Sequence, residues 1–198
     1  MTESPSSSSA GSSKTIDVSD PAIIAQYEPY LRMLARTRVR RAYQAKIGAS
    51  DMVQQAMMQA VQGFDGFRGT TEGELLAWLR QILAHHLCHL DRDLHRDKRD
   101  IRREQSMEQK LAQSSMRLEG LLAGHSPTPS QNVALGENII RISQAIAKLP
   151  DSQSDAVRLH YLEGMKLSEV AAELGKSTGA VAGLLHRGMK TLRSQLDE

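Results

Sequence analysis

The sequence predicts an all-α protein of two small helical domains joined by a flexible linker, and three observations support this prediction. Apolar residues recur at the three- and four-residue spacings of amphipathic helices, and nothing alternates like a strand. A stretch rich in Gln, Ser and Gly, ending in HSPTPSQN, divides the chain, because prolines discourage a continuous helix. Residues 167–193 are typical of a helix-turn-helix, which we expect in the C-terminal domain.

The first domain is expected to span 20–103, after a disordered Ser-rich tail at 1–19. Asp51 stands where the N-cap of its second helix belongs. Three apolar stripes define its helices: Ile23, Ile24, Tyr27, Tyr30, Leu31 and Leu34; then Val53, Ala56, Met57, Ala60, Val61 and Phe64; then Leu75, Leu76, Leu79, Ile82, Leu83, Leu87 and Leu90.

The second domain is expected to span 138–198, after a linker at 104–137 that includes a short helix around 107–122. Its first helix carries Ile139, Ile142, Ile146 and Leu149, and Pro150 ends that helix. Another helix, with Ala156, Val157 and Tyr161, leads into the helix-turn-helix.

The helix-turn-helix is placed by local chemistry. Gly175 favours the left-handed conformation that ends a helix, and Ser177 or Thr178 can cap the next helix. Winding that helix gathers Val181, Leu185, Gly188 and Leu192 on one face and Gly183, His186, Arg187, Lys190 and Ser194 on the other. We expect the first face to pack and the second to meet phosphate or solvent. An ordinary helical hairpin with a solvated charged face is the alternative.

Composition favours a cytoplasmic protein that binds a polyanion. The net charge is +2, but basic residues gather around 32–46 and 92–103, as in proteins that bind a polyanion. The single cysteine, Cys88, fits a reducing compartment. The sequence contains no apolar run of membrane-spanning length and no signal-peptide pattern, so we expect a cytoplasmic protein without membrane contact.

A metal enzyme is the main rival class. His85 and His89 lie one helical turn apart, with Cys88 and Asp91 nearby, and such a spacing can bind zinc. Neither an HExxH motif nor a glycine-rich phosphate loop accompanies them, so we expect no catalytic residue, metal or cofactor. A response-regulator transcription factor is another alternative, although it would normally place an acidic, strand-bearing domain ahead of its helix-turn-helix.

Two groups of motifs follow each other along the chain. The first comprises DMVQQAMMQAVQGFDGF at 51–67 and LLAWLRQIL at 75–83, and the second comprises KLPDSQSDAVRLHYLEGMKLSEVAAELGKSTGAVAGLLHRGMKTLR at 148–193. In this order they resemble the extracytoplasmic-function (ECF) sigma factors of bacterial RNA polymerase, and the AVAGLLHRGMKTLR variant is similar to those of planctomycete-type bacteria. The resemblance implies that 20–103 is sigma region 2 and 138–198 is sigma region 4.

The function that this resemblance implies is an alternative sigma factor. Such a protein binds core RNA polymerase, directs it to specific promoter DNA and promotes DNA opening; an anti-sigma factor is a further candidate partner. A helix-turn-helix regulator that does not act as a sigma factor is the alternative function. The resemblance also implies contact with core polymerase through Asp51, Val53 and Gln54. On their own, Asp51 could merely cap a helix and Gln54 could be solvated.

For the −10 region and DNA melting, the resemblance implies a set that extends into the basic segment: Trp78, Arg80, His85, His86, Arg92, Arg96 and Arg99. Many family members have Asn at or beside the position of His85, so the resemblance does not identify the preferred base. Trp78 could equally pack in the core. The arginines could form ion pairs with nearby aspartates. For the −35 region, the implied set is Ser177, Thr178, Gly183, His186, Arg187 and Lys190. Relatives often carry basic or hydroxyl side chains at 182–184, so phosphate contacts are expected to outweigh base reading.

Overall fold

All regular secondary structure in the described part of the chain is helical. The structure, a computed structural model, describes residues 20–38, 49–95, 101–123 and 135–196. The N-terminal half contains η1 (Pro21–Tyr27), α1 (Glu28–Arg36), α3 (Ala49–Gly63), η2 (Phe64–Gly66) and α4 (Glu72–His95). After α5 (Ile101–Ala123), the C-terminal half contains α6 (Leu135–Lys148), α7 (Asp151–Val157), η4 (Arg158–Leu162), α8 (Leu167–Leu174) and α9 (Thr178–Leu196). The all-α prediction is confirmed, since no strand occurs in these described ranges.

The predicted stripes build the N-terminal half, with two corrections. All six residues of the first stripe are buried, as are those of the third up to Leu87. Val61, in contrast, is 53% exposed on the outer side of α3. Asp51 is not the N-cap, because α3 already begins at Ala49; its carboxylate lies in the first turn, where the helix dipole favours a negative charge.

The predicted linker is the largest difference between expectation and structure. Its first part, up to Ala123, belongs to the 23-residue helix α5, which is longer than the short helix expected at 107–122. Leu111 and Leu118 are fully buried, and each contributes roughly 2 kcal/mol by burial. This part of the segment is therefore a packed element and not a flexible tether. Residues 124–134, like the tail at 1–19, lie outside the described residues.

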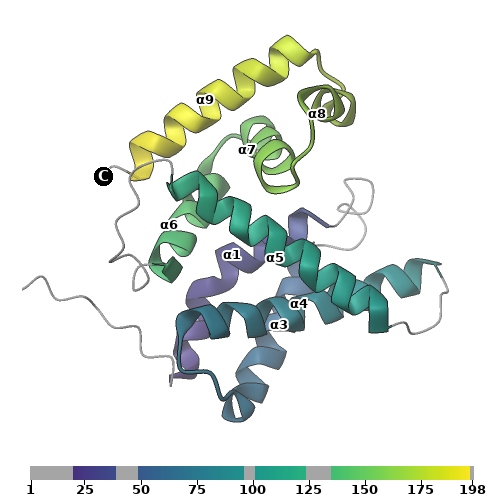
Figure 1. Cartoon of the computed structure of the whole chain (residues 1–198), viewed down its shortest axis with the longest axis vertical. Helices are drawn as coiled ribbons and strands as arrows, with labels where there is room; N and C mark the ends of the chain where they lie inside the picture. The colour runs from purple at the N-terminus through teal and green to yellow at the C-terminus, as the bar shows by residue number, and fades with distance from the viewer. Residues whose placement is uncertain (1–19, 39–48, 96–100, 124–134, 197–198) are drawn as a thin grey trace, which may run out of the picture.

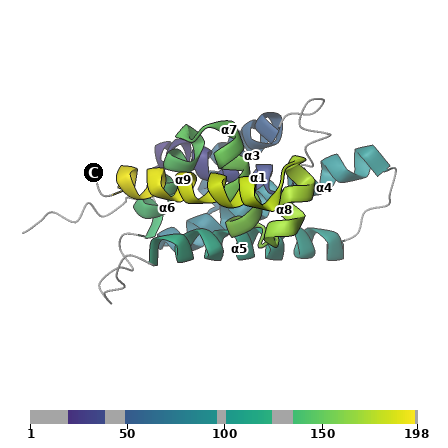
Figure 2. The same cartoon turned by 90° about the horizontal axis from the view of Figure 1, so that it is seen from above.

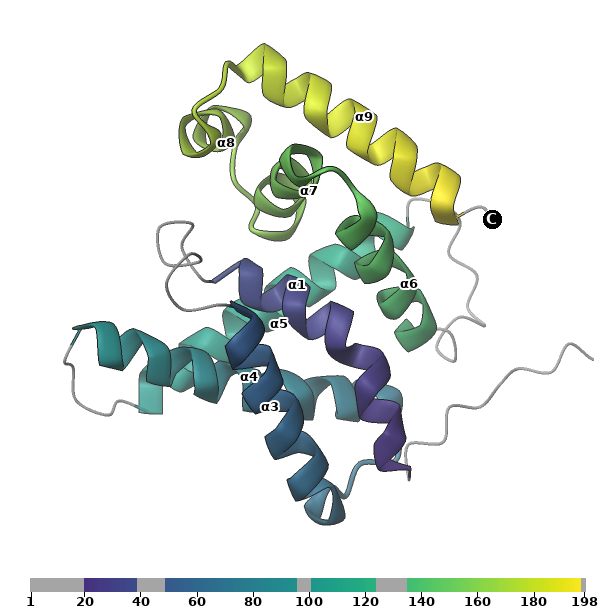
Figure 3. The same cartoon turned by 180° about the vertical axis from the view of Figure 1, so that it is seen from behind.

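The arrangement places α5 across both halves. In Figure 1, α7, α8 and α9 lie at one end of the molecule and α3 and α4 lie at the other, with α5 crossing between them. Figure 2 shows α5 running along one edge of the molecule. From behind, α1 occupies the middle of the fold, between α3 and α6 (Figure 3). The buried apolar residues of the two halves accordingly form one continuous cluster, so the halves are in contact here and the predicted domain boundaries stay a prediction.

Candidate nucleic-acid interfaces

The helix-turn-helix forms as the local sequence predicts. The Glu169 carboxylate accepts the backbone N–H of Lys166 at 2.6 Å and so caps the start of α8. Gly175 adopts φ +63°, and the following N–H of Lys176 returns to the Ala171 carbonyl at 2.9 Å. Ser177 Oγ then accepts the N–H of Ala180 at 3.2 Å, which caps the start of α9. The turn and both caps hold α9 at a fixed angle to α8.

The two faces of α9 separate as expected. Val181, Leu185 and Leu192 are buried, and Gly188 permits close packing, since a Cβ there would lie 3.1 Å from Val157 Cγ2. Leu184 is also buried, with 8% exposure. The burial of this face against α7 leaves the opposite face of α9 free.

The outer face of α9 is a basic surface with open access. His186, Arg187 and Lys190 are exposed, and in the described part of the chain they form no ion pair. The Arg187 guanidinium lies over Gly183, where a Cβ would come within 3.3 Å of Nη1. The glycine thus gives the arginine room along the helix. Ser177 and Thr178 are exposed at the end of α9 from which this face begins.

On α3, the structure separates the three residues assigned to core polymerase. Asp51 and Gln54 are exposed on one side of the helix, one turn apart. Val53 points the other way and is fully buried in the core of the N-terminal half. In this conformation the Val53 side chain is packed inside, where it anchors the helix that presents the other two. Its expected contact with core polymerase stays a prediction.

Trp78 on α4 packs within an aromatic cluster. Its ring centroid lies 5.1 Å from that of Phe67 and 6.3 Å from that of Phe64. Such edge and tilted arrangements stabilise aromatic packing by about 0.5–1.5 kcal/mol beyond burial. Trp78 remains partly exposed and lines a groove between α4 and α5. In this structure Trp78 thus packs mainly against the two phenylalanine rings, and part of its side chain remains exposed in the groove.

Arg80 turns inward from α4. Its Nη1 donates to the Tyr30 hydroxyl at 3.2 Å, and its Nε lies 3.9 Å from the Glu108 carboxylate of α5. The side chain is only 14% exposed. Burial raises the pKa of Tyr30, so its hydroxyl stays protonated at neutral pH. Arg80 is consequently engaged with internal partners and not with solvent.

The two histidines of α4 also have protein partners. His85 Nδ1 lies 3.5 Å from the Glu104 carboxylate of α5, and the rings of His85 and His89 are 4.4 Å apart. His86 Nε2 lies 2.7 Å from the amide oxygen of Gln59. Partial burial, followed by the neighbouring histidines, lowers the pKa of His86, so a neutral ring predominates at neutral pH. The His85 imidazole lines the same groove as Trp78, and so does Gln59, the partner of His86.

Three arginines of the expected melting set cannot be placed. Arg92 belongs to α4, but its side chain is outside the described residues, and Arg96 and Arg99 are outside them altogether. Within the described ranges, no group of three His, Cys, Asp or Glu side chains could hold a metal ion. Across those same ranges, no helix is both long and apolar enough to cross a bilayer.

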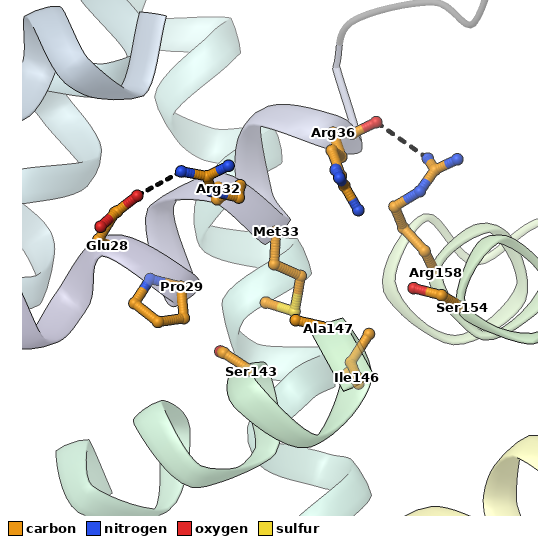
Figure 4. A pocket seen from close by; sticks show the side chains of 10 residues that line it. All are labelled: Glu28, Pro29, Arg32, Met33, Arg36, Ser143, Ile146, Ala147, Ser154 and Arg158. Carbon is orange, nitrogen blue, oxygen red and sulfur yellow. Dashed lines mark hydrogen bonds and ion pairs between the residues drawn. The ribbon is translucent and has the colours of Figure 1, made fainter. Parts of the chain in front are cut away.

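Sequence reasoning missed a buried polar junction between the halves. Arg158 is 8% exposed, and its Nη1 donates to the Arg36 carbonyl at the end of α1 at 3.0 Å (Figure 4). It also pairs with Glu163 and, at 3.3 Å, with Asp155. Burial raises the pKa of Glu163 to about 7 against the opposing effect of Arg158. No local pattern could reveal this junction, because its partners are 122 residues apart.

Beside this junction lies a cavity of about 180 Å³. Figure 4 shows Met33 of α1 directed toward Ile146 and Ala147 of α6, with Arg32 and Arg36 along one side. Arg32 is paired with Glu28, one turn away on the same helix. The cavity marks where α1 and α6 meet without complete packing.

Comparison with known proteins gives consistent matches. Residues 139–192, from α6 to α9, match the family model described as Sigma-70, region 4. The chain is 30% identical over 147 residues to the RNA polymerase sigma factor CnrH of Cupriavidus metallidurans, covering 74% of this chain and 72% of CnrH. It is 23% identical over 174 residues to the ECF RNA polymerase sigma factor SigD of Mycobacterium tuberculosis, covering 88% and 75%. Against a solved structure of CnrH in complex with the cytosolic domain of CnrY, it has a TM-score of 0.31 and 22% identity, over 89% and 86% of the two chains.

Proposed function

Because the chain belongs to the ECF sigma factors of bacterial RNA polymerase, and so directs the polymerase to promoters, we propose how its helices divide this work. Region 2, residues 20–103, binds the core enzyme and acts on the −10 element, and region 4, residues 138–198, reads the −35 element. The observation that carries the proposal is the basic face of α9, with exposed His186, Arg187 and Lys190 on a helix held by packing and caps.

The face of α9 suits contact with the DNA backbone. Arg187 and Lys190 lie within one turn of each other, so both can approach phosphates on one side of the major groove. Ala182 and Gly183 offer no polar side chain for a base edge. Phosphate contacts thus position this helix, and His186 is the side chain nearest to a base-reading role.

Core polymerase is bound by the outer face of α3. Asp51 and Gln54 supply a carboxylate and an amide on the exposed side of the helix, which suit charge-assisted contacts with the polymerase clamp helices. Val53 supports this face from within the core. On α4, His85, His86 and Arg80 act on the −10 element once their present partners release them.

All nucleotide chemistry belongs to the polymerase, so the chain itself is a non-catalytic initiation factor without metal or cofactor. It works in the cytoplasm, where the polymerase transcribes DNA. An anti-sigma factor is a further candidate partner. The planctomycete-type subgroup stays a prediction from the AVAGLLHRGMKTLR variant.

Retention on core polymerase tests the assignment of α3. We expect the Asp51→Ala, Gln54→Ala double variant to lose core binding without loss of stability, because both side chains are exposed. The matched control is Gln62→Ala with Asp65→Ala, another exposed amide and carboxylate near the far end of the helix. Co-purification with bacterial core enzyme, and in vitro transcription over a promoter library, measure the result. Equal retention of both double variants would place the interface elsewhere.

A further inference from the structure

Helix α5 is tied to both halves of the chain at one point. Ser114 Oγ accepts a hydrogen bond from Arg38 Nη2 at 2.9 Å and donates to the Leu162 carbonyl at 3.0 Å. Arg38 also donates to the Lys110 carbonyl at 2.9 Å, and Arg117 donates to Leu162 at 3.2 Å. The end of α1, the middle of α5 and the end of η4 therefore meet at a fully buried hydroxyl.

Other buried polar side chains also join distant segments near this hydroxyl. Among the five buried polar residues of the described part of the chain, Ser114, Ser115 and Arg158 each form a hydrogen bond to a segment distant in sequence. Water can replace each of these hydrogen bonds when the junction opens, so each favours closure only modestly. Polar contacts of this kind are typical of halves that separate during function.

The N-terminal end of α5 covers the candidate melting face of α4. Glu104 and Glu108 lie one turn apart and stand 3.5 Å from His85 and 3.9 Å from Arg80, respectively. Their carboxylates occupy positions beside the groups that a DNA phosphate or an unpaired base would otherwise contact. Both acids and Trp78 line the groove between the two helices.

We propose that α5 is an internal clasp, which holds the two halves together through Ser114 and covers α4 with Glu104 and Glu108. The free chain consequently binds unpaired DNA weakly, and core polymerase exposes α4 by displacing α5. The covering of DNA contacts rests on the proposed role of α4. The closure itself does not, and it can be measured without DNA or polymerase.

Closure is tested on the free chain by single-molecule fluorescence transfer. Dyes are placed at exposed positions by Val61→Cys on α3 and Ala172→Cys on α8, in a Cys88→Ala background. We expect Ser114→Ala to raise the open fraction on the order of tenfold, because Arg38 and Leu162 lose their shared partner. Retained helicity by circular dichroism shows that the chain is folded. An unchanged distance distribution in the folded variant would overturn the clasp.

Covering is tested with the Glu104→Gln, Glu108→Gln chain, whose two changes are at partly exposed positions. We expect its affinity for oligo(dT), by fluorescence anisotropy, to rise on the order of fivefold. The charge-matched control is Glu119→Gln with Glu173→Gln. Glu119 lies about 22 Å along α5 from Glu104, well beyond the electrostatic screening length of about 8 Å. We therefore expect the control variant to bind oligo(dT) with unchanged affinity.

Comparing the free chain with the holoenzyme distinguishes the covering of α4 by α5 from the proposed role of α4 in DNA binding. If polymerase displaces α5, the advantage of the Glu104→Gln, Glu108→Gln chain should disappear once core enzyme is bound. An equal gain in free chain and holoenzyme, or an equal gain in the control variant, would assign the effect to net charge and overturn the covering. If Ser114→Ala opens the chain as expected but the Glu104→Gln, Glu108→Gln chain shows no change in oligo(dT) affinity, the proposed role of α4 would be contradicted. The clasp would then only hold the two halves together.

Discussion

The two regions that we propose contact DNA differ in how available their side chains are. On α9, His186, Arg187 and Lys190 face solvent, whereas on α4 Arg80 and His85 face the acids of α5 and His86 faces Gln59. In our proposal the first surface can contact duplex DNA without rearrangement, because its backbone is fixed by Gly175 and Ser177. The second must exchange protein partners for DNA. We therefore propose that the surface for duplex DNA is preformed and that DNA opening depends on a rearrangement.

The largest effect is expected from the helix that creates this difference. Leu118→Ala should lower the free energy of unfolding by about 2–5 kcal/mol, since Leu118 is fully buried. Urea unfolding followed by circular dichroism measures it. Met116→Ala, on the same helix at 68% exposure, is the control and should stay within about 0.5 kcal/mol. A mild effect of Leu118→Ala would restore the view of α5 as a loose linker.

The next effect concerns the histidines of α4. Replacing His85 and His86 with Ala should leave closed-complex formation intact but slow promoter opening, since a lost contact to an unpaired base costs about 1–3 kcal/mol. Permanganate footprinting of unpaired thymines reads opening directly. A premelted bubble should restore part of the transcription, because unpairing is then already complete. Wild-type opening rates on duplex DNA would leave both histidines with only the partners seen here.

A smaller and more uniform effect is expected from α9. Arg187→Ala and Lys190→Ala should each reduce the slope of log affinity against log salt by about 0.9, with unchanged stability. Filter binding of holoenzyme across a salt series measures the slope. Lys148→Ala, which removes an exposed positive charge at the end of α6, is the control. A slope equal to that of the control would assign both side chains to solvent.

Sequence could predict what neighbouring residues decide. The turn at Gly175, the cap at Ser177 and the packed stripe of α9 depend on residues a few positions apart, and all are confirmed. The packing of α5 could not be predicted in the same way. Its buried residues include Ser114 and Ser115, which look like surface residues until Arg38, Leu162 and Tyr30 supply their partners from distant positions.

The same limit applies to the candidate sites. The family pattern groups Asp51, Val53 and Gln54, but it does not show that the first and last are exposed on α3 while Val53 is packed in the core. On α4, the acids opposite Arg80 and His85 come from a segment predicted as linker, so nothing near them in sequence shows that they are covered.

The smallest expected effect is a pH dependence of the free energy of unfolding. Glu163 faces Arg158, Arg38 and Glu173, and burial raises the pKa of its carboxyl group from 4.5, the usual value, to about 7. Between these two values the folded chain holds a proton that the unfolded chain releases, and this stabilisation is present at low pH and lost as pH rises toward 7. Urea midpoints should fall between about pH 5 and pH 7.5, less so in Glu163→Gln. Parallel curves for the two chains would remove Glu163 from the pH response.

Hydrogen exchange on addition of core polymerase tests the contrast between the two regions most directly. The amides of α5, Ile101–Ala123, should lose protection when the free chain becomes holoenzyme, because the helix leaves α4. The amides of α9, Thr178–Leu196, should keep their protection, since that helix is already in its binding conformation. Unchanged protection of α5 in an active holoenzyme would contradict the account, and so would a loss of protection confined to α9.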